Sequence, residues 1–225
     1  MKPLSRLNVF RLPLINPIWI PCLILFATGY ALAFKLPLPP GLKQISVQTN
    51  RAIKGLDDFD LFVNRIADSQ PDLPAAVYVQ GILQFLIVQQ PSEDPIYVSD
   101  KPGVITQYRD AAQNGVIGLL AHNFLSGALF SQLTTGQEVL VIFGDHTVRR
   151  YQVTSIHQFQ KLNPSDVYSD YLDLSDGKKL TSSQVFDLFY RGAEHVTFQT
   201  CLKEGPIWNW GLLIIIALPL EKQDP

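Results

Sequence analysis

Cysteine is scarce in this chain of 225 residues, whose two thiols are Cys22 and Cys201. Because Cys22 lies inside an apolar run near the N-terminus, a disulfide framework is not expected. Charge is also scarce, at 17% of residues against a typical value of about 25%. The 18 Lys and Arg residues are balanced by 20 Asp and Glu residues, so the chain has no basic footprint of a nucleic-acid-binding protein.

Charged residues are missing from one long stretch, between Leu12 and Phe34. Its 23 residues are enough to cross a hydrocarbon core of about 30 Å as a helix. Lys2, Arg6 and Arg11 precede it, and basic residues in that place keep the N-terminus in the cytoplasm and send the following chain outward. The stretch predicts an exported protein with an N-terminal apolar helix at the membrane.

Two kinds of export segment fit this stretch, and both stay open. Prolines interrupt its first half and weaken a spanning helix there: Pro13, Pro17 and Pro21. The part from Cys22 to Phe34 has the length of a signal peptide, and Ala31-Leu32-Ala33 resembles a cleavage site. Residues 1–34 are therefore assigned to a membrane anchor or a cleaved signal peptide. A buried core helix fits the flanking charges less well.

Residues 35–74 connect this segment to the rest of the chain. Pro37, Pro39 and Pro40 predict a stiff, extended spacer. Apolar residues recur at helical spacing from Leu56 to Ile66, and this pattern predicts a lead-in helix that covers the core. The main domain then spans residues 75–225.

The sequence from residue 75 onward is mostly of β type. Two β-rich runs flank the turn sequence GDHT and predict a hairpin over residues 137–156. Ten apolar residues from Gly211 to Leu220 are too few for a membrane span, and they indicate a strand buried on both faces. Further strands are expected within residues 75–91, 116–123 and 194–201, short helices or turns within 101–115, 125–136 and 180–192, and a polar loop at 163–177. The expected fold is mainly β, with six to eight strands and a few short helices.

Cys201 ends one of the predicted strands, and a cysteine can be inert or reactive at such a place. Free cysteine is among the residue types most often buried, so an inert core sulfur is one interpretation. A reactive cysteine attacks as its thiolate, which requires a nearby imidazole or cation and donors for the oxyanion that forms. Whether a histidine lies close to Cys201 therefore distinguishes the inert from the reactive interpretation.

The chain has four histidines, and they differ in their access to Cys201. His195 has the same strand parity, but six residues of strand at about 3.3 Å each place it roughly 20 Å away. His146 lies in the hairpin turn and is expected to be solvated, while His157 is expected on a strand surface. His122 closes a buried strand, where reactive groups sit on a rigid scaffold, so it is the favoured partner.

Two stretches together resemble the sortases, the cysteine transpeptidases of bacterial cell surfaces. These are GLLAHNFLSGALFSQLTTGQEVLVIFGDHTVRRYQVTSI, with a strand that ends in His122, and HVTFQTCLKEG, with the TFQTC motif that ends in Cys201. Phe198 stands where the family has leucine, and 79 residues separate His122 from Cys201. The resemblance covers roughly residues 75–220.

The resemblance implies a sortase-like closed β-barrel of eight strands and a thioester mechanism. Cys201 would attack a backbone carbonyl in a sorting-type peptide of surface proteins, and His122 would protonate the leaving amine. An amine acceptor, which the sequence does not identify, would make the protein a transpeptidase, and water would make it a peptidase. No cofactor and no metal are implied. The protein would work on the extracellular face of the membrane or as a secreted enzyme.

One feature departs from the family pattern. Sortases carry an arginine on the strand after the cysteine, and here its place falls at about Leu212. A leucine cannot donate a hydrogen bond, and losing one oxyanion donor typically costs about 10²–10³ in rate. Arg191 is the first candidate to replace it, although a charge at a helix C-terminus also explains Arg191, and Asn209 is a second candidate. Other donors in the domain are Arg109, Arg149, Arg150, Trp208 and Trp210.

The missing arginine leaves an alternative function open. The chain would then be a sortase-fold surface module with weakened turnover that binds peptide or protein. The L,D-type cell-wall transpeptidases also use cysteine and histidine, but they carry a Ser-His-Gly-Cys cluster that TFQTC lacks. The sortase-type enzyme is the favoured prediction.

Overall fold

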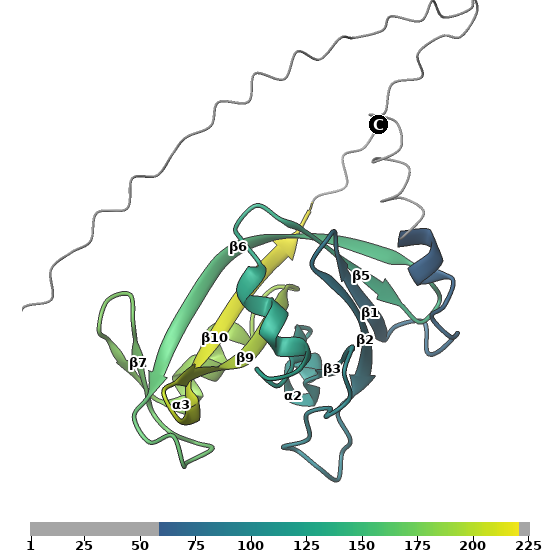
Figure 1. Ribbon diagram of the computed structural model, residues 1–225. Helices are drawn as coiled ribbons and strands as arrows, with labels where there is room; N and C mark the ends of the chain where they lie inside the picture. The colour runs from purple at the N-terminus through teal and green to yellow at the C-terminus, as the bar shows by residue number, and fades with distance from the viewer. Residues whose placement is uncertain (1–58, 221–225) are drawn as a thin grey trace, which may run out of the picture. The chain divides into compact units, whose positions relative to one another are not determined.

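In the computed structural model, which describes residues 59–220, the chain is built mainly from antiparallel and parallel β-strands (Figure 1). The predicted export segment and the proline-containing spacer lie outside the described residues. No helix between residues 59 and 220 has the length and apolarity needed to cross a membrane. The elements are β1 (Pro74–Val79), β2 (Leu83–Gln89), β3 (Val104–Gln107), α2 (Arg109–Gln113), β4 (Ile117–Leu120), η1 (Ser126–Gln132), β5 (Glu138–Phe143), β6 (Val148–Lys161), β7 (Tyr171–Asp173), β8 (Lys179–Leu180), α3 (Ser182–Phe189), β9 (Val196–Glu204) and β10 (Ile207–Pro219).

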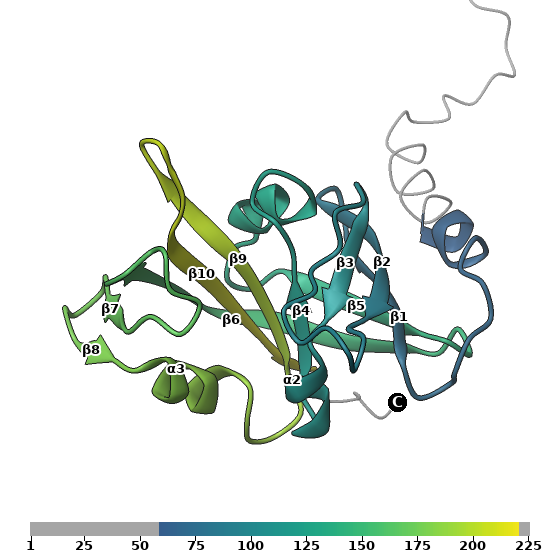
Figure 2. The ribbon, with the colours of Figure 1, turned by 90° about the horizontal axis from the view of Figure 1, so that it is seen from below.

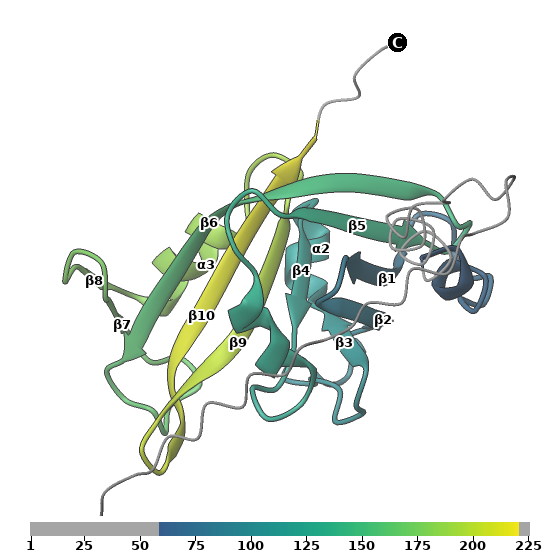
Figure 3. The same cartoon turned by 45° about the horizontal axis from the view of Figure 1, so that its top comes forward.

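Eight of these strands close into a barrel. The hydrogen-bonded order runs β10-β9-β4-β3-β2-β1-β5-β6, and β6 pairs with β10 to complete the ring. Figure 3 shows β6 and β10 side by side, and their antiparallel register joins Gly211 to Gln160 at one end and Pro219 to Tyr151 at the other. The small strands β7 and β8 continue the sheet outward from the end of β6. The predicted closed barrel of eight strands is confirmed.

Alternating side chains of the strands fill the barrel and cover its outer face. Val196, Phe198, Leu213 and Ile215 belong to the buried cluster inside the barrel. Leu212 and Ile214 on β10 point the other way, into a second cluster between the barrel and the helices α2 and α3. The strand β10 is therefore buried on both faces, as its continuous apolar run predicts.

Helix α3 lies over the outer face of the barrel beside β7 and β8 (Figure 2). It begins after Thr181, whose Oγ1 accepts a hydrogen bond from the Gln184 backbone amide at 3.2 Å, while Gln184 Oε1 accepts from the Thr181 amide at 2.9 Å. This reciprocal cap satisfies two amide groups that a helix N-terminus otherwise leaves free. Val185 and Phe189 anchor the helix in the outer cluster.

Residues 59–63 are helical and cover another part of the barrel surface. Phe59, Phe62 and Val63 pack against a small buried cluster that includes Tyr78 and Ile142. The Phe59 and Tyr78 rings meet edge to face, with their centroids 5.0 Å apart. This packing matches the lead-in helix expected around these positions.

Two segments differ from the expectation. Residues 101–115 form strand β3 before the helix α2, because β2 and β4 pair with β3 on either side. Residues 163–177 include the short strand β7, in which Tyr171 is buried in the outer cluster. In both places contacts with neighbouring strands set the conformation.

Candidate active site

Cys201 lies on β9 and faces the outside of the barrel. Val196 and Phe198, on the opposite face of the strand, point into the barrel core, so residues 197, 199 and 201 point outward as their parity predicts. Cys201 is half-buried and packs against the outer cluster. Its partner across the strand pair is Leu212 on β10.

Strands β4 and β9 run parallel, and their pairing brings His122 towards Cys201. The register joins Ile117 to Val196 at one end and Leu120 to Gln199 at the other. One residue further, the Thr200 hydroxyl donates to the backbone carbonyl of Ala121 at 2.8 Å. His122 is the next residue after Ala121, two positions past the end of β4, and Cys201 is the next residue after Thr200 on β9.

Aromatic packing determines the surroundings of His122. The His122 and Phe124 rings are stacked, with centroids 5.1 Å apart and planes 14° apart. Phe124 in turn meets Trp208 edge to face at 6.0 Å. The Asn123 side chain donates to the backbone carbonyl of Trp208 at 2.7 Å, which ties this loop to the β9–β10 hairpin. The half-buried imidazole therefore lies between the end of β4 and the hairpin that carries Cys201.

The electrostatics around Cys201 favour the protonated thiol in the resting protein. Burial raises the pKa of the Cys201 thiol, and the Lys161 ammonium opposes this by lowering the pKa. Burial also raises the pKa of the neighbouring Tyr171 to about 12, and the negative charge of a Cys201 thiolate contributes to that rise. Among residues 59–220 no group makes a hydrogen bond with the Cys201 sulfur. A Cys201 that reacted as a nucleophile would need a base to remove the thiol proton.

A pocket of about 620 Å³ opens on the same outer face of the barrel. Leu120, Gln199 and Leu212 form part of its lining, and the last two are the neighbours of Cys201 on β9 and β10. The Tyr190 hydroxyl donates to Gln199 Oε1 at 2.8 Å, which fixes the amide beneath α3. Other aromatic lining residues are Tyr108, Tyr168, Tyr171 and Phe186. The pocket thus offers apolar and aromatic surface close to the thiol.

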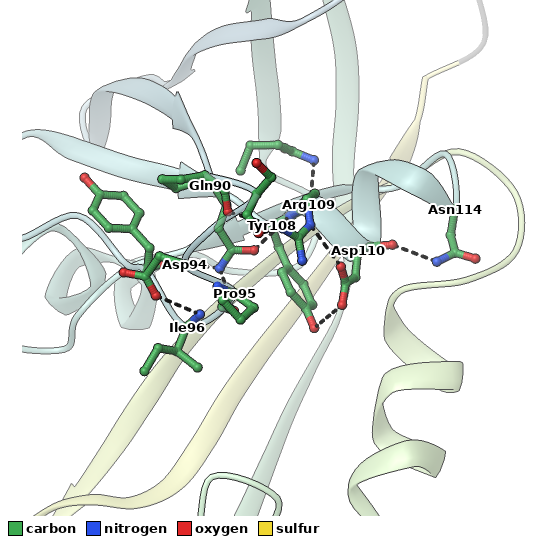
Figure 4. Close-up of polar contacts among 12 residues, drawn as sticks. Gln90, Asp94, Pro95, Ile96, Tyr108, Arg109, Asp110 and Asn114 are labelled. Carbon is green, nitrogen blue, oxygen red and sulfur yellow. Dashed lines mark hydrogen bonds and ion pairs between the residues drawn. The ribbon is translucent and has the colours of Figure 1, made fainter.

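Hydrogen bonds hold the segment around residues 90–97 as one side of this pocket (Figure 4). Gln90 donates through its side chain to the carbonyls of Pro95 and Tyr97, at 3.1 and 3.0 Å, and accepts from the Arg109 amide at 3.2 Å. The Arg109 guanidinium donates to the carbonyl of Ser92 at 2.6 Å. These hydrogen bonds hold the Arg109 side chain against this loop.

The arginines and the asparagine proposed to replace the family arginine have partners elsewhere. Arg191 Nε lies 2.9 Å from Asp187 Oδ1 in an exposed ion pair, although Arg191 does line the pocket. Asn209 donates to the carbonyl of Pro164 at 2.7 Å. Arg149 pairs with Glu194, and Arg150 pairs with Glu138. Their roles in catalysis remain predictions, and Leu212 stands opposite Cys201 at the place expected for the arginine.

The other three histidines are engaged away from the thiol. His195 is buried just before β9, with its ring nitrogens 2.7 and 3.1 Å from the carbonyls of Ala193 and Phe189. His146 lies in the β5–β6 turn with φ of 65°, 3.1 Å from the carbonyl of Ile66. His157 differs from the expected surface position, because α3 covers it and the Phe189 ring lies 4.9 Å away.

Lys161 and Tyr171 had not been singled out from the sequence. They precede Cys201 by 40 and 30 residues, and neither lies in a motif. They come to the thiol because β6 flanks β10 and β7 pairs with the end of β6, where Lys161 stands opposite Tyr171. No local pattern of residues indicates these non-local pairings.

Comparison with known proteins gives a structural likeness without a sequence match. No family model matches the chain, and no curated protein matches it. Among solved structures, the chain is similar to a sortase D5 transpeptidase of Clostridium perfringens, at 14% identity and a TM-score of 0.43 over 73% of this chain and 88% of that one. It is similar to sortase A of Listeria monocytogenes, at 11% identity and a TM-score of 0.43 over 67% and 89%. It is also similar to sortase C of C. perfringens with the C-terminal cell wall sorting motif, at 17% identity and a TM-score of 0.37 over 79% and 92%.

Proposed function

We propose that this chain is a sortase-type cysteine transpeptidase or peptidase, with Cys201 as nucleophile and His122 as acid and base. The observation that carries the proposal is the parallel pairing of β4 with β9. The Thr200 hydroxyl bonds the Ala121 carbonyl where these strands meet, and His122 and Cys201 are the next residues along the two segments. The sequence motifs around both residues are those that resemble the sortases.

The reaction follows from these two groups. As the Cys201 sulfur attacks the peptide carbonyl carbon, its proton passes to the imidazole of His122, and the carbonyl oxygen becomes an oxyanion. Collapse of this intermediate breaks the C–N bond, and His122 returns the proton to the leaving amine. The acyl group remains on sulfur as a thioester. An incoming amine, or water, attacks the thioester and releases Cys201.

The pocket beside Cys201 suits the acyl side of a peptide substrate. Its apolar and aromatic lining can bury side chains, and Gln199 offers a fixed amide for one backbone group. Because Gln199 and Leu212 adjoin Cys201, a peptide lying in the pocket would present a carbonyl to the sulfur. The sequence of that peptide is not specified by these features.

The first test measures alkylation of Cys201 by iodoacetamide between pH 6 and 10 in the full-length chain. Peptide mass spectrometry follows Cys201 separately from Cys22. We expect His122→Ala to slow the reaction near neutral pH, because the imidazole no longer accepts the thiol proton. A rate equal to that of a free thiol peptide, with no response to His122→Ala, contradicts the proposal.

The second test looks for turnover. The protein is incubated with a library of peptides and an amine acceptor such as triglycine, and the mass of the Cys201 peptide is measured after an acid quench. We expect an acyl adduct in the unsubstituted protein and none in Cys201→Ala. A reactive Cys201 that never carries an acyl group contradicts turnover.

A second function is favoured by one specific observation, the leucine opposite Cys201. Leu212 is buried in the outer cluster and offers no donor to an oxyanion. A surface module that binds peptide in the pocket without turning it over fits this feature. Peptide binding that is equally tight in the unsubstituted protein and in Cys201→Ala, with no acyl adduct in either, would support it.

The predicted N-terminal export segment leads to a proposal about where the protein is located. Residues 12–34 would export the domain and either anchor it or be cleaved from it. Measuring the intact mass of the chain in membrane and medium fractions distinguishes these outcomes. Recovery of the full-length chain in the cytoplasm alone contradicts export.

A further inference from the structure

One row of residues crosses three neighbouring strands on the outer face of the barrel. Cys201 on β9 pairs with Leu212 on β10, and Leu212 pairs with Phe159 on β6. Leu212 and Phe159 are buried, and Cys201 packs against the cluster that contains them. Leu212 therefore places a hydrocarbon side chain directly opposite the thiol. A cation that approaches the sulfur must come from a residue outside this row.

Lys161 occupies such a position. It is two residues after Phe159 on β6, and residues two apart on a strand share a face, so it belongs to the face that carries Cys201 and Leu212. It stands opposite Tyr171, which is buried in the same cluster. Its Nζ donates to the backbone carbonyl of Asp166 at 3.3 Å, a long contact that leaves other donors of the ammonium free. Its aliphatic stem can lie along Leu212 while the charged end approaches the sulfur.

Other charged or titratable groups face Cys201 from the surrounding elements. Lys203 follows on the same face of β9, but its Nζ lies 3.7 Å from the centroid of the Trp208 ring and is directed to that side chain. Tyr171 on β7 stays neutral at physiological pH, because its pKa is raised to about 12. His122 is the proton acceptor. Lys161 is the cation whose charge lowers the pKa of the Cys201 thiol.

We infer that Lys161 supplies the positive charge beside Cys201 that a sortase-type site needs and that Leu212 cannot supply. The catalytic part of this inference depends on the proposed function. The ammonium stabilises the thiolate as the thiol proton moves to His122, and then the oxyanion that forms on attack. A point charge on a flexible stem can serve both positions, because the sulfur and the carbonyl oxygen lie one bonded carbon apart in the intermediate.

The test compares three substitutions in the full-length chain. Lys161→Met removes the charge and keeps most of the stem, and Lys161→Arg keeps the charge. Lys179→Met is the matched control, because it removes one lysine from β8, where the side chain is exposed. The rate of Cys201 alkylation by the neutral reagent iodoacetamide is measured from pH 6 to pH 10, and circular dichroism checks that each variant is folded.

We expect Lys161→Met to react about three- to tenfold more slowly at pH 7, because less of the thiol is ionised. Lys161→Arg should stay within about twofold of the unsubstituted protein. Lys179→Met should leave the rate unchanged. The difference between the variants should narrow towards pH 10, as more of the thiol is ionised in each. A change of packing would instead leave a rate difference that does not depend on pH.

The outcomes separate this inference from the proposed function. If His122→Ala slows alkylation but Lys161→Met behaves like Lys179→Met, the role of Lys161 is refuted and the catalytic pair stands. If Lys161→Met slows alkylation but His122→Ala does not, Lys161 stabilises the thiolate and the proposed function fails. A rate difference for Lys161→Met that does not narrow as the pH rises also refutes the inference.

Discussion

Gly127 lies where the start of η1 touches the junction between β4 and β9. A Cβ at this position would lie 2.8 Å from the carbonyl oxygens of Ala121 and His122, and closer still to Thr200 Oγ1. Real Cβ contacts essentially never fall below 3.0 Å, so Gly127→Ala forces the helix or the junction to move. The atoms that block it are mostly backbone, which cannot rotate away.

The cost can be worked out from these contacts. Overpacking of this kind typically costs about 1–3 kcal/mol. Losing the buried hydrogen bond from Thr200 to Ala121 adds about 1 kcal/mol. Replacing glycine by alanine recovers up to about 1 kcal/mol through the entropy of the unfolded chain. The unfolding free energy should therefore fall by about 1–3 kcal/mol, and His122 should move away from Cys201.

Urea unfolding followed by tryptophan fluorescence measures the stability, and alkylation of Cys201 at pH 7 measures the site. The control is Ala128→Ser, at the next residue of η1, where the side chain is exposed. We expect Gly127→Ala to lower the urea midpoint. We also expect it to reduce the amount by which His122→Ala slows the alkylation of Cys201. Unchanged stability and an unchanged response would refute the close packing of η1 against the two strand ends.

Three further predictions concern the thiol, the strand opposite it and helix α3. Leu212→Arg should raise Cys201 alkylation at pH 7 by about tenfold, because it places a cation opposite the sulfur; a folded variant with a slower rate would contradict this. Because burial raises the pKa of the Cys201 thiol, the unfolded chain loses that proton first as the pH rises, so stability should fall between pH 8 and 10. Urea unfolding should show a smaller fall in Cys201→Ala, and equal slopes would contradict the burial of the sulfur. Thr181→Ala removes the cap of α3 and should lower stability by about 1 kcal/mol, measured by thermal unfolding, whereas Thr181→Ser should retain it.

Local patterns in the sequence were enough for several elements. The hairpin around Gly144 follows from turn residues that act within a few positions. Burial of β10 on both faces follows from its unbroken apolar run. The position of His122 at the end of a buried strand also follows from its local sequence. Each of these depends on residues that are neighbours in the chain.

Local patterns failed where distant strands decide the conformation or the environment. Residues 104–107 form a strand because β2 and β4 pair with them on either side. His157 is half-buried because the Phe189 ring of α3 packs against its ring. Neither effect leaves a periodic signal in the affected segment, so the sequence pattern there is compatible with other structures.

The sequence by itself indicated a mainly-β domain in which His122 follows a buried strand, because apolar runs are local properties. The strand that was expected to end at Cys201 continues to Glu204, because its pairing with β10 extends that far. Only the tertiary structure decided that β4 and β9 are parallel neighbours and that Leu212 pairs with Cys201 across the β9–β10 pair. The physical reason is barrel closure. The order of strands that are 40 to 80 residues apart depends on all eight pairings being satisfied at once, and no single segment encodes it.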